Sequence, residues 1–227
     1  MRQAVFRVGI AIAVTVGAVL PSALPAPPAH SDADVTIAVV GDSYTAGTAA
    51  GGRGPQSWPQ TMGHLLAAHG MQIDADVQAE GGAGYAHIGE RGATFQSLTA
   101  RAVHDDDELV VFFGSVNDVP MDPLYPVTVA RTFRLARTLA PDARFLVIGP
   151  VWPSADPPPE LFEVRDNLRS EATMAGARFV DPVAAHWLAG HPELIGPDRI
   201  HPNDAGHVYL AKKIAPLVVR ELIFGTM

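Results

Sequence analysis

Cysteine is absent from the 227-residue chain, which therefore has neither a disulfide scaffold nor a zinc site built on cysteine. Basic residues are also scarce, because 16 lysines and arginines stand against 24 aspartates and glutamates, a formal net charge of −8 at pH 7. Such a chain presents no electrostatic footprint for nucleic acid or for an anionic lipid surface. We expect neither as a partner.

A long hydrophobic run is missing as well. The most apolar stretch, Val8 to Leu20, has thirteen residues, whereas a helix that crosses a bilayer needs about 20. Two arginines precede this stretch and a proline-rich segment follows it, which is the pattern of a secretory signal peptide. We therefore predict a signal peptide and processing region over residues 1–30 and a single folded domain over residues 31–227.

Export follows from this interpretation, so we expect a secreted or cell-envelope protein with no stable membrane span once it is processed. The alternative is an N-terminal anchor that is retained, because no cleavage site is clean. The candidate last residues of the signal peptide are Ala29, Ser31 and Ala33.

From Val35 onward, short β-branched runs alternate with helical stretches, which predicts a three-layer α/β/α sandwich with a mostly parallel sheet. The runs are almost continuously hydrophobic, so helices are expected on both faces of the sheet. The five expected strands are Val35 to Val40, Ile73 to Gln78, Leu109 to Phe113, Phe145 to Ile148 and Phe179 to Val180. The expected helices are Ser57 to His69, Thr94 to Val103, Pro126 to Leu139, Glu160 to Ala175 and Asn203 to Leu222.

Unusual polar loops follow these strands. Their sequences are GDSY at 41–44, GGAGY at 81–85, GSVND at 114–118 and DRIHP at 198–202. In a parallel sheet, ligands bind outside the carboxyl ends of the strands. We therefore expect a serine, glycines, an asparagine and an Asp/His pair to meet on one rim.

Those residues supply what acyl transfer needs. The hydroxyl of Ser43 is a weak nucleophile and must lose its proton to a nearby base, for which His201 is the candidate. Asp198, three residues earlier, is positioned to hold the other ring N–H of His201. The oxyanion that forms needs donors, for which we propose the backbone N–H of Ser43, a glycine N–H from the second loop and the amide of Asn117.

The four motifs, in this order and at these spacings, resemble the SGNH (GDSL-type) hydrolases. The resemblance implies a flavodoxin-like sheet of five parallel strands and a serine hydrolase acting on esters. It also implies Ser43 as nucleophile, His201 as base, Asp198 as its orienter, and Ser43, Gly84 and Asn117 as the oxyanion hole. The choice of Gly84 over Gly82 rests on its place before Tyr85. No metal or cofactor is expected.

One departure from the family pattern is Tyr44, which replaces the leucine of GDSL and should alter packing behind the nucleophile, not the chemistry. Taken alone, Ser43 is also a common helix cap, and Asp42 and Asp118 are expected to hold their loops structurally. The chain lacks the GxSxG elbow and the GxxxxGK[ST] phosphate loop.

We therefore predict a secreted esterase for carboxylic esters of short or medium acyl chains, with lipid or acylated-glycan substrates. The alternatives are a thioesterase or lysophospholipase of the same family, and a non-catalytic envelope-binding protein that keeps the fold.

Overall fold

Five parallel strands form a single sheet in the order β2-β1-β3-β4-β5. The computed structural model describes residues 35–224, so the predicted signal peptide lies outside the described residues. This strand order is that of flavodoxin-like sheets, and it confirms the predicted fold class. The strands are β1 (Val35–Gly41), β2 (Ile73–Ala79), β3 (Leu109–Phe113), β4 (Arg144–Ile148) and β5 (Arg178–Val180).

Each predicted helix is present within a few residues of its expected bounds. They are α2 (Trp58–Ala67), α3 (Phe95–Ala102), α4 (Tyr125–Leu139), α5 (Pro159–Met174) and α6 (Asp204–Phe224). The structure also contains elements that were not predicted: a four-residue helix, α1 (Ser43–Ala46), and three short 3₁₀ turns, at Gly54–Gln56, Val116–Asp118 and Pro192–Leu194.

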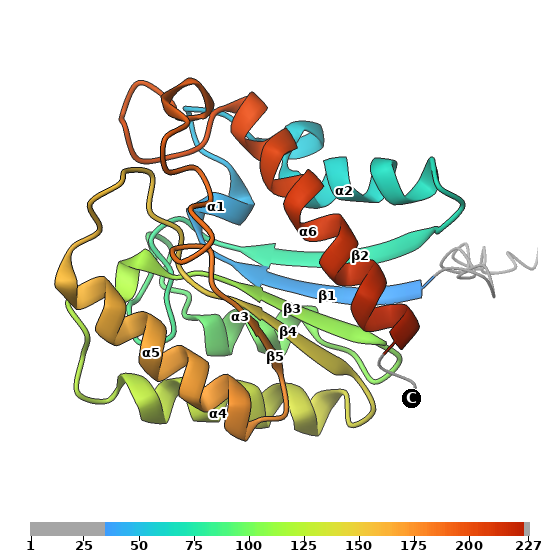
Figure 1. Cartoon of the computed structure of the whole chain (residues 1–227). Coiled ribbons are helices and arrows are strands. Elements are labelled where there is room, and N and C mark those ends of the chain that lie inside the picture. Colours follow the sequence, from blue (N-terminus) through green and yellow to red (C-terminus); the bar gives the residue numbers. More distant parts are fainter. Residues whose placement is uncertain (1–34, 225–227) are drawn as a thin grey trace, which may run out of the picture. The chain divides into compact units, whose positions relative to one another are not determined.

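Both faces of the sheet are covered, as the hydrophobic strands predicted (Figure 1). Alternate strand residues enter two separate cores: Ile37 and Val39 pack with α2 and α6, whereas Ala38 and Val40 pack with α3, α4 and α5. All four side chains are fully buried. Burial on both faces explains why the central strands β1, β3 and β4 show no polar alternation, whereas the edge strand β2 has Asp74, Asp76 and Gln78 at alternate positions.

The carboxyl ends of the strands lie level with one another. Gly41, the last residue of β1, pairs with Ala79 on one side and Phe113 on the other, and Phe113 pairs with Ile148. The loops that follow therefore leave the sheet at one edge. β2 lies on one side of β1 and β3 on the other, so the strand order reverses at β1. In sheets of this order, ligands bind at the switch point between β1 and β3, beyond the carboxyl ends of these strands.

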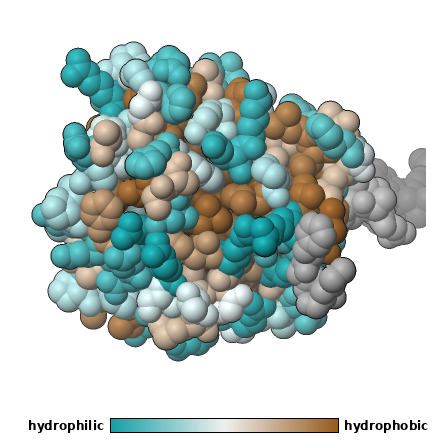
Figure 2. Space-filling model, viewed as in Figure 1, coloured by the Kyte–Doolittle hydropathy of each residue, from teal (hydrophilic) through white to brown (hydrophobic). Residues whose placement is uncertain are grey.

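One face of the molecule shows hydrophobic residues in its middle, between α5 and α6, with hydrophilic residues around them (Figure 2). The edge strand β5 lies there, and its Phe179 and Val180 are only partly buried. Among the described residues, no helix has the length and hydropathy needed to cross a membrane.

Candidate active site

Ser43 lies where β1 gives way to α1, at the carboxyl edge of the sheet. Asp42 caps this short helix, because its Oδ1 accepts the backbone N–H of Tyr44 at 2.9 Å. The expected structural role of Asp42 is thereby confirmed. Ser43 retains 7% exposure and lines the cavity above the sheet.

The loop before α6 fixes His201 through Asp198. Asp198 Oδ1 accepts the backbone N–H groups of Ile200 and His201, each at 3.0 Å, and its Oδ2 accepts the Nδ1 proton of His201 at 2.8 Å. These hydrogen bonds hold the pKa of Asp198 down to about 2, against an ordinary 3.8. The carboxylate is therefore ionised at neutral pH and selects the tautomer of His201 whose Nε2 is unprotonated.

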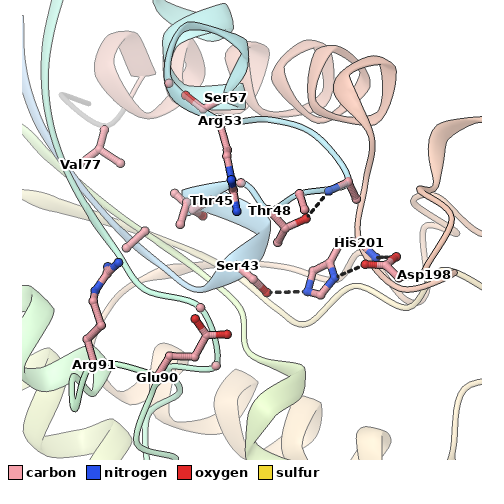
Figure 3. A pocket seen from close by; sticks show the side chains of 18 of the residues that line it. Ser43, Thr45, Thr48, Arg53, Ser57, Val77, Glu90, Arg91, Asp198 and His201 are labelled. Atoms are coloured by element: carbon pink, nitrogen blue, oxygen red, sulfur yellow. Dashed lines mark hydrogen bonds and ion pairs between the residues drawn. The ribbon is translucent and has the colours of Figure 1, made fainter.

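Ser43 and His201, 158 residues apart in the sequence, meet across the cavity. Their Oγ and Nε2 atoms are 3.0 Å apart, and the Ser43–His201–Asp198 chain of contacts is drawn in Figure 3. The side chain of His201 is 24% exposed and that of Asp198 41%. A base within hydrogen-bond reach of the hydroxyl and an orienter on its far side are what nucleophile activation requires.

Tyr44 does more than pack behind the nucleophile. Its ring lies 6.5 Å from that of Phe113 and 5.8 Å from that of His201, centroid to centroid. Its hydroxyl donates to the backbone carbonyl of Ile200, and burial raises the pKa of that hydroxyl, so it stays a donor. The departure from GDSL therefore links the helix that begins at Ser43 to the loop that carries His201.

The glycine-rich loop after β2 is held by Asp118, which lies just after β3. The Asp118 carboxylate accepts three backbone N–H groups, from Tyr85, Ala86 and His87, at 2.9 to 3.0 Å. A Cβ on Gly84 would lie 2.5 Å from this carboxylate, so the close approach requires glycine. Asp118 therefore has a structural role, but the loop that it holds is the one after β2 and not, as expected, its own.

The choice of Gly84 as an oxyanion donor is not supported. Its N–H donates to the carbonyl of His87 at 3.0 Å, and Gly84 is not among the described residues that line the cavity. Gly82 does line it, and its N–H has no acceptor among residues 35–224. Gly82, the alternative to Gly84 in the sequence-based prediction, therefore offers a free donor at the cavity.

Asn117 and the backbone of Ser43 complete this side of the cavity. The Asn117 side-chain nitrogen donates to the carbonyl of Ala83 at 2.9 Å and makes a longer contact, 3.4 Å, with Asp42 Oδ2. The N–H of Ser43, in the first turn of α1, donates to no acceptor in the described part of the chain. Ser43, Gly82 and Asn117 all line the cavity; within the described residues the N–H groups of Ser43 and Gly82 are free, whereas the Asn117 amide already donates to Ala83 and contacts Asp42.

Asp42 is fully buried below these donors. Burial raises its pKa to about 7, and the nearby charge of Asp118 acts in the same direction, whereas the hydrogen bond from Tyr44 opposes them. Two carboxylates thus organise the floor of the site without touching the cavity. Neither Asp42 nor Asp118 lines it.

The family of the chain follows from its similarity to known proteins. The GDSL-like lipase/acylhydrolase family model matches residues 39–209. The chain belongs to this family. A GDSL lipase of Mycobacterium tuberculosis is 56% identical over 191 residues, which are 82% of this chain and 83% of that protein. The hydrolase described here therefore acts on ester bonds, which favours the enzyme over the non-catalytic binding protein.

Solved structures share the fold of this hydrolase at low sequence identity. That of TesA gives a TM-score of 0.66 at 22% identity and covers 82% of this chain and 99% of that one. That of Est24, a carbohydrate acetylesterase from Sinorhizobium meliloti, gives 0.61 at 18% identity over 82% and 99%. These likenesses extend to the fold alone.

The cavity of the hydrolase, about 1180 Å³, contains further residues that the sequence analysis did not single out. Arg53 comes from the loop between α1 and α2, and Glu90 and Arg91 from the loop after β2. No motif marks them, because they reach the cavity through long loops. Within the described residues, no group of three histidine or acidic residues is arranged to hold a metal ion.

Proposed function

We propose that the chain is a secreted or cell-envelope serine esterase that hydrolyses carboxylic esters of short or medium acyl chains through an acyl-enzyme intermediate. The observation that carries the proposal is the pair of contacts that join Ser43 Oγ to His201 Nε2 at 3.0 Å and His201 Nδ1 to Asp198 at 2.8 Å. Family membership supplies the reaction class, and this geometry supplies the residues.

In the first half-reaction, Ser43 Oγ attacks the ester carbonyl carbon while its proton passes to His201 Nε2. The carbonyl oxygen becomes an oxyanion, which the N–H groups of Ser43 and Gly82 stabilise, joined by the Asn117 amide when it gives up its long contact with Asp42. Collapse of this intermediate breaks the bond to the alcohol, and His201 returns the proton to the departing oxygen. The acyl group stays on Ser43.

In the second half-reaction, water replaces the alcohol. His201 takes a proton from the water as its oxygen attacks the acyl carbon, and then gives that proton to Ser43 Oγ as the acid leaves. Asp198 stabilises the imidazolium that forms in each half-reaction. Its pKa of about 2 keeps it ionised at neutral pH, which supports this role.

The cavity favours a short acyl group over a long alkyl chain. Apart from alanines, its described lining has only two apolar side chains, Pro55 and Val77, so a long chain finds little hydrophobic surface. Polar alcohols such as acylated glycans fit this lining better than lipids. Est24, which shares the fold, is named a carbohydrate acetylesterase.

The test is active-site labelling followed by a substrate series. A fluorophosphonate probe should label the wild-type protein and leave Ser43→Ala unlabelled, since only an activated serine reacts. With 4-nitrophenyl esters from acetate to palmitate, kcat/KM should be highest for chains of two to about eight carbons. Labelling of folded Ser43→Ala would refute the nucleophile. Best activity on palmitate, or on a thioester analogue, would refute the substrate class.

Export is tested separately. Expression in a bacterial host with its own secretion machinery should release a protein whose N-terminal sequence begins after Ala29, Ser31 or Ala33. Recovery of the intact N-terminus in the membrane fraction would instead establish an N-terminal anchor.

A further inference from the structure

The catalytic cavity has a cationic wall beside the nucleophile. Figure 3 shows Arg53 and Arg91, which come from two different loops, projecting toward the space on the side of Ser43 that faces away from His201. Arg91 Nε lies 3.6 Å from the carboxylate of Glu80. Arg53 has no carboxylate within salt-bridge distance among residues 35–224, so its guanidinium is available to a ligand.

The loop that carries Arg53 is fastened on both sides of that residue. The N–H of Gly52 donates to Asp204 Oδ1 at 2.8 Å, and the N–H of Trp58 donates to His207 Nδ1 at 3.3 Å. Gly52 has a φ of +74°, and a Cβ there would lie 1.9 Å from the buried ring of His207. Arg53 is therefore presented by a backbone that is tied to the start of α6, a few residues after His201.

The direction of the reaction decides which half of the ester meets this wall. His201 must protonate the departing oxygen, so the alcohol lies on the His201 side of Ser43. The acyl group then extends to the other side, where Arg53 and Arg91 project. A guanidinium without a partner favours a carboxylate, which it binds through paired, charge-assisted hydrogen bonds.

We propose that Arg53 selects esters whose acyl group ends in a carboxylate, that is, half-esters of short dicarboxylic acids. This inference rests on the proposed function and names its acyl class. Glu90 lines the same wall, where its carboxylate lies close to Gly81. Its charge opposes a bound anion, so Arg53 and Glu90 should affect the selectivity in opposite directions.

Matched alkyl esters test the proposal: monoethyl succinate against ethyl butyrate, and monoethyl glutarate against ethyl valerate, followed by acid release in a pH-stat. The measured quantity is the ratio of kcat/KM for the anionic ester to that for its neutral partner. Arg53→Gln should lower this ratio about 10- to 100-fold, as expected for loss of a charge-assisted hydrogen bond. Glu90→Gln should raise it. Arg131→Gln, on the exposed face of α4, is the control and should leave the ratio unchanged.

The outcomes separate this inference from the function on which it rests. If the wild type cleaves 4-nitrophenyl acetate through Ser43 but Arg53→Gln leaves the ratio unchanged, the acyl selectivity is refuted and the esterase stands. A preference for an anionic alcohol, measured as 4-acetoxybenzoate over its methyl ester and lost in Arg53→Gln, also overturns it. If no ester is cleaved, both proposals fall.

Discussion

The two loops that face each other across the cavity are built in different ways. In the loop before α6, Asp198 holds the backbone of Ile200 and His201 and the ring of His201, all within three residues of itself. In the glycine-rich loop after β2, the organising carboxylate is Asp118, more than 30 residues away in the sequence. The first loop is a local structure, whereas the second takes its shape from a neighbouring strand's loop.

This difference explains which roles can be inferred from sequence. A motif whose members contact one another carries its own geometry, so the spacing of Asp198 and His201 predicts their hydrogen bond. A glycine in a loop that is held by residues distant in the sequence shows only that some group lies close to its backbone. For Gly84 the close neighbour is a structural carboxylate, not a substrate.

The largest effect on turnover is expected from replacing Ser43, or either of the two side chains in the loop before α6, Asp198 and His201. Ser43→Ala and His201→Ala should each lower kcat about 10⁶-fold, and Asp198→Ala about 10⁴-fold, by analogy with serine proteases. Asp198→Asn should lose a similar factor, because its amide faces His201 Nδ1 and disturbs the tautomer. Circular dichroism and steady-state kinetics check these variants. Substantial turnover by folded Ser43→Ala would exclude the mechanism.

Asn117→Ala, on the side of the cavity opposite the loop before α6, should have the next largest effect on turnover. The amide acts on charge that develops in the transition state, so kcat should fall about 10²- to 10³-fold while KM changes little. Kinetics with 4-nitrophenyl acetate measure both. A rise in KM at constant kcat would instead make Asn117 a residue for ground-state binding.

Much of the fold was predictable because the central strands β1, β3 and β4 are hydrophobic runs that end at a glycine. β3 has the predicted bounds, and each of the other strands is longer than predicted by one residue. α1 was missed because four residues carry no helical periodicity. Arg53, Glu90 and Arg91 were missed because their place in the cavity depends on the course of two long loops and on contacts to Asp204 and His207, which no local pattern encodes.

A pair of glycine variants sharpens the comparison within the second loop. Gly84→Ala places a Cβ 2.5 Å from the buried Asp118 carboxylate, which is fixed by three hydrogen bonds, so the free energy of unfolding should fall by roughly 1–3 kcal/mol. In Gly82→Ala the nearest atom to the Cβ is 3.6 Å away, and only the positive φ of 76° opposes the side chain, at a cost of about 1–2 kcal/mol. Urea unfolding compares the two. A larger loss of stability in Gly82→Ala would mean that Asp118 yields and does not define the loop.

The smallest effect on turnover is expected from Asp42, whose signature lies in the pH dependence of stability. Its folded pKa of about 7 exceeds its ordinary value of 3.8. Between those values the folded protein holds a proton that the unfolded chain has lost, so rising pH destabilises the wild type through this residue. Asp42→Asn cannot titrate and keeps an oxygen for the N–H of Tyr44.

The free energy of unfolding of the wild type, relative to that of Asp42→Asn, should therefore fall by up to about 1.4 kcal/mol per pH unit as pH rises from 4 to 7. Urea denaturation at several pH values measures both proteins under the same conditions, and Asp105→Asn, at an exposed turn, is the control. Parallel stability curves for the wild type and Asp42→Asn would show that Asp42 is ionised in the folded protein. The charge beneath the oxyanion donors would then be stabilised by the hydrogen bonds from the Tyr44 N–H and the Ser115 side chain, with the Asn117 amide at 3.4 Å from Asp42 Oδ2.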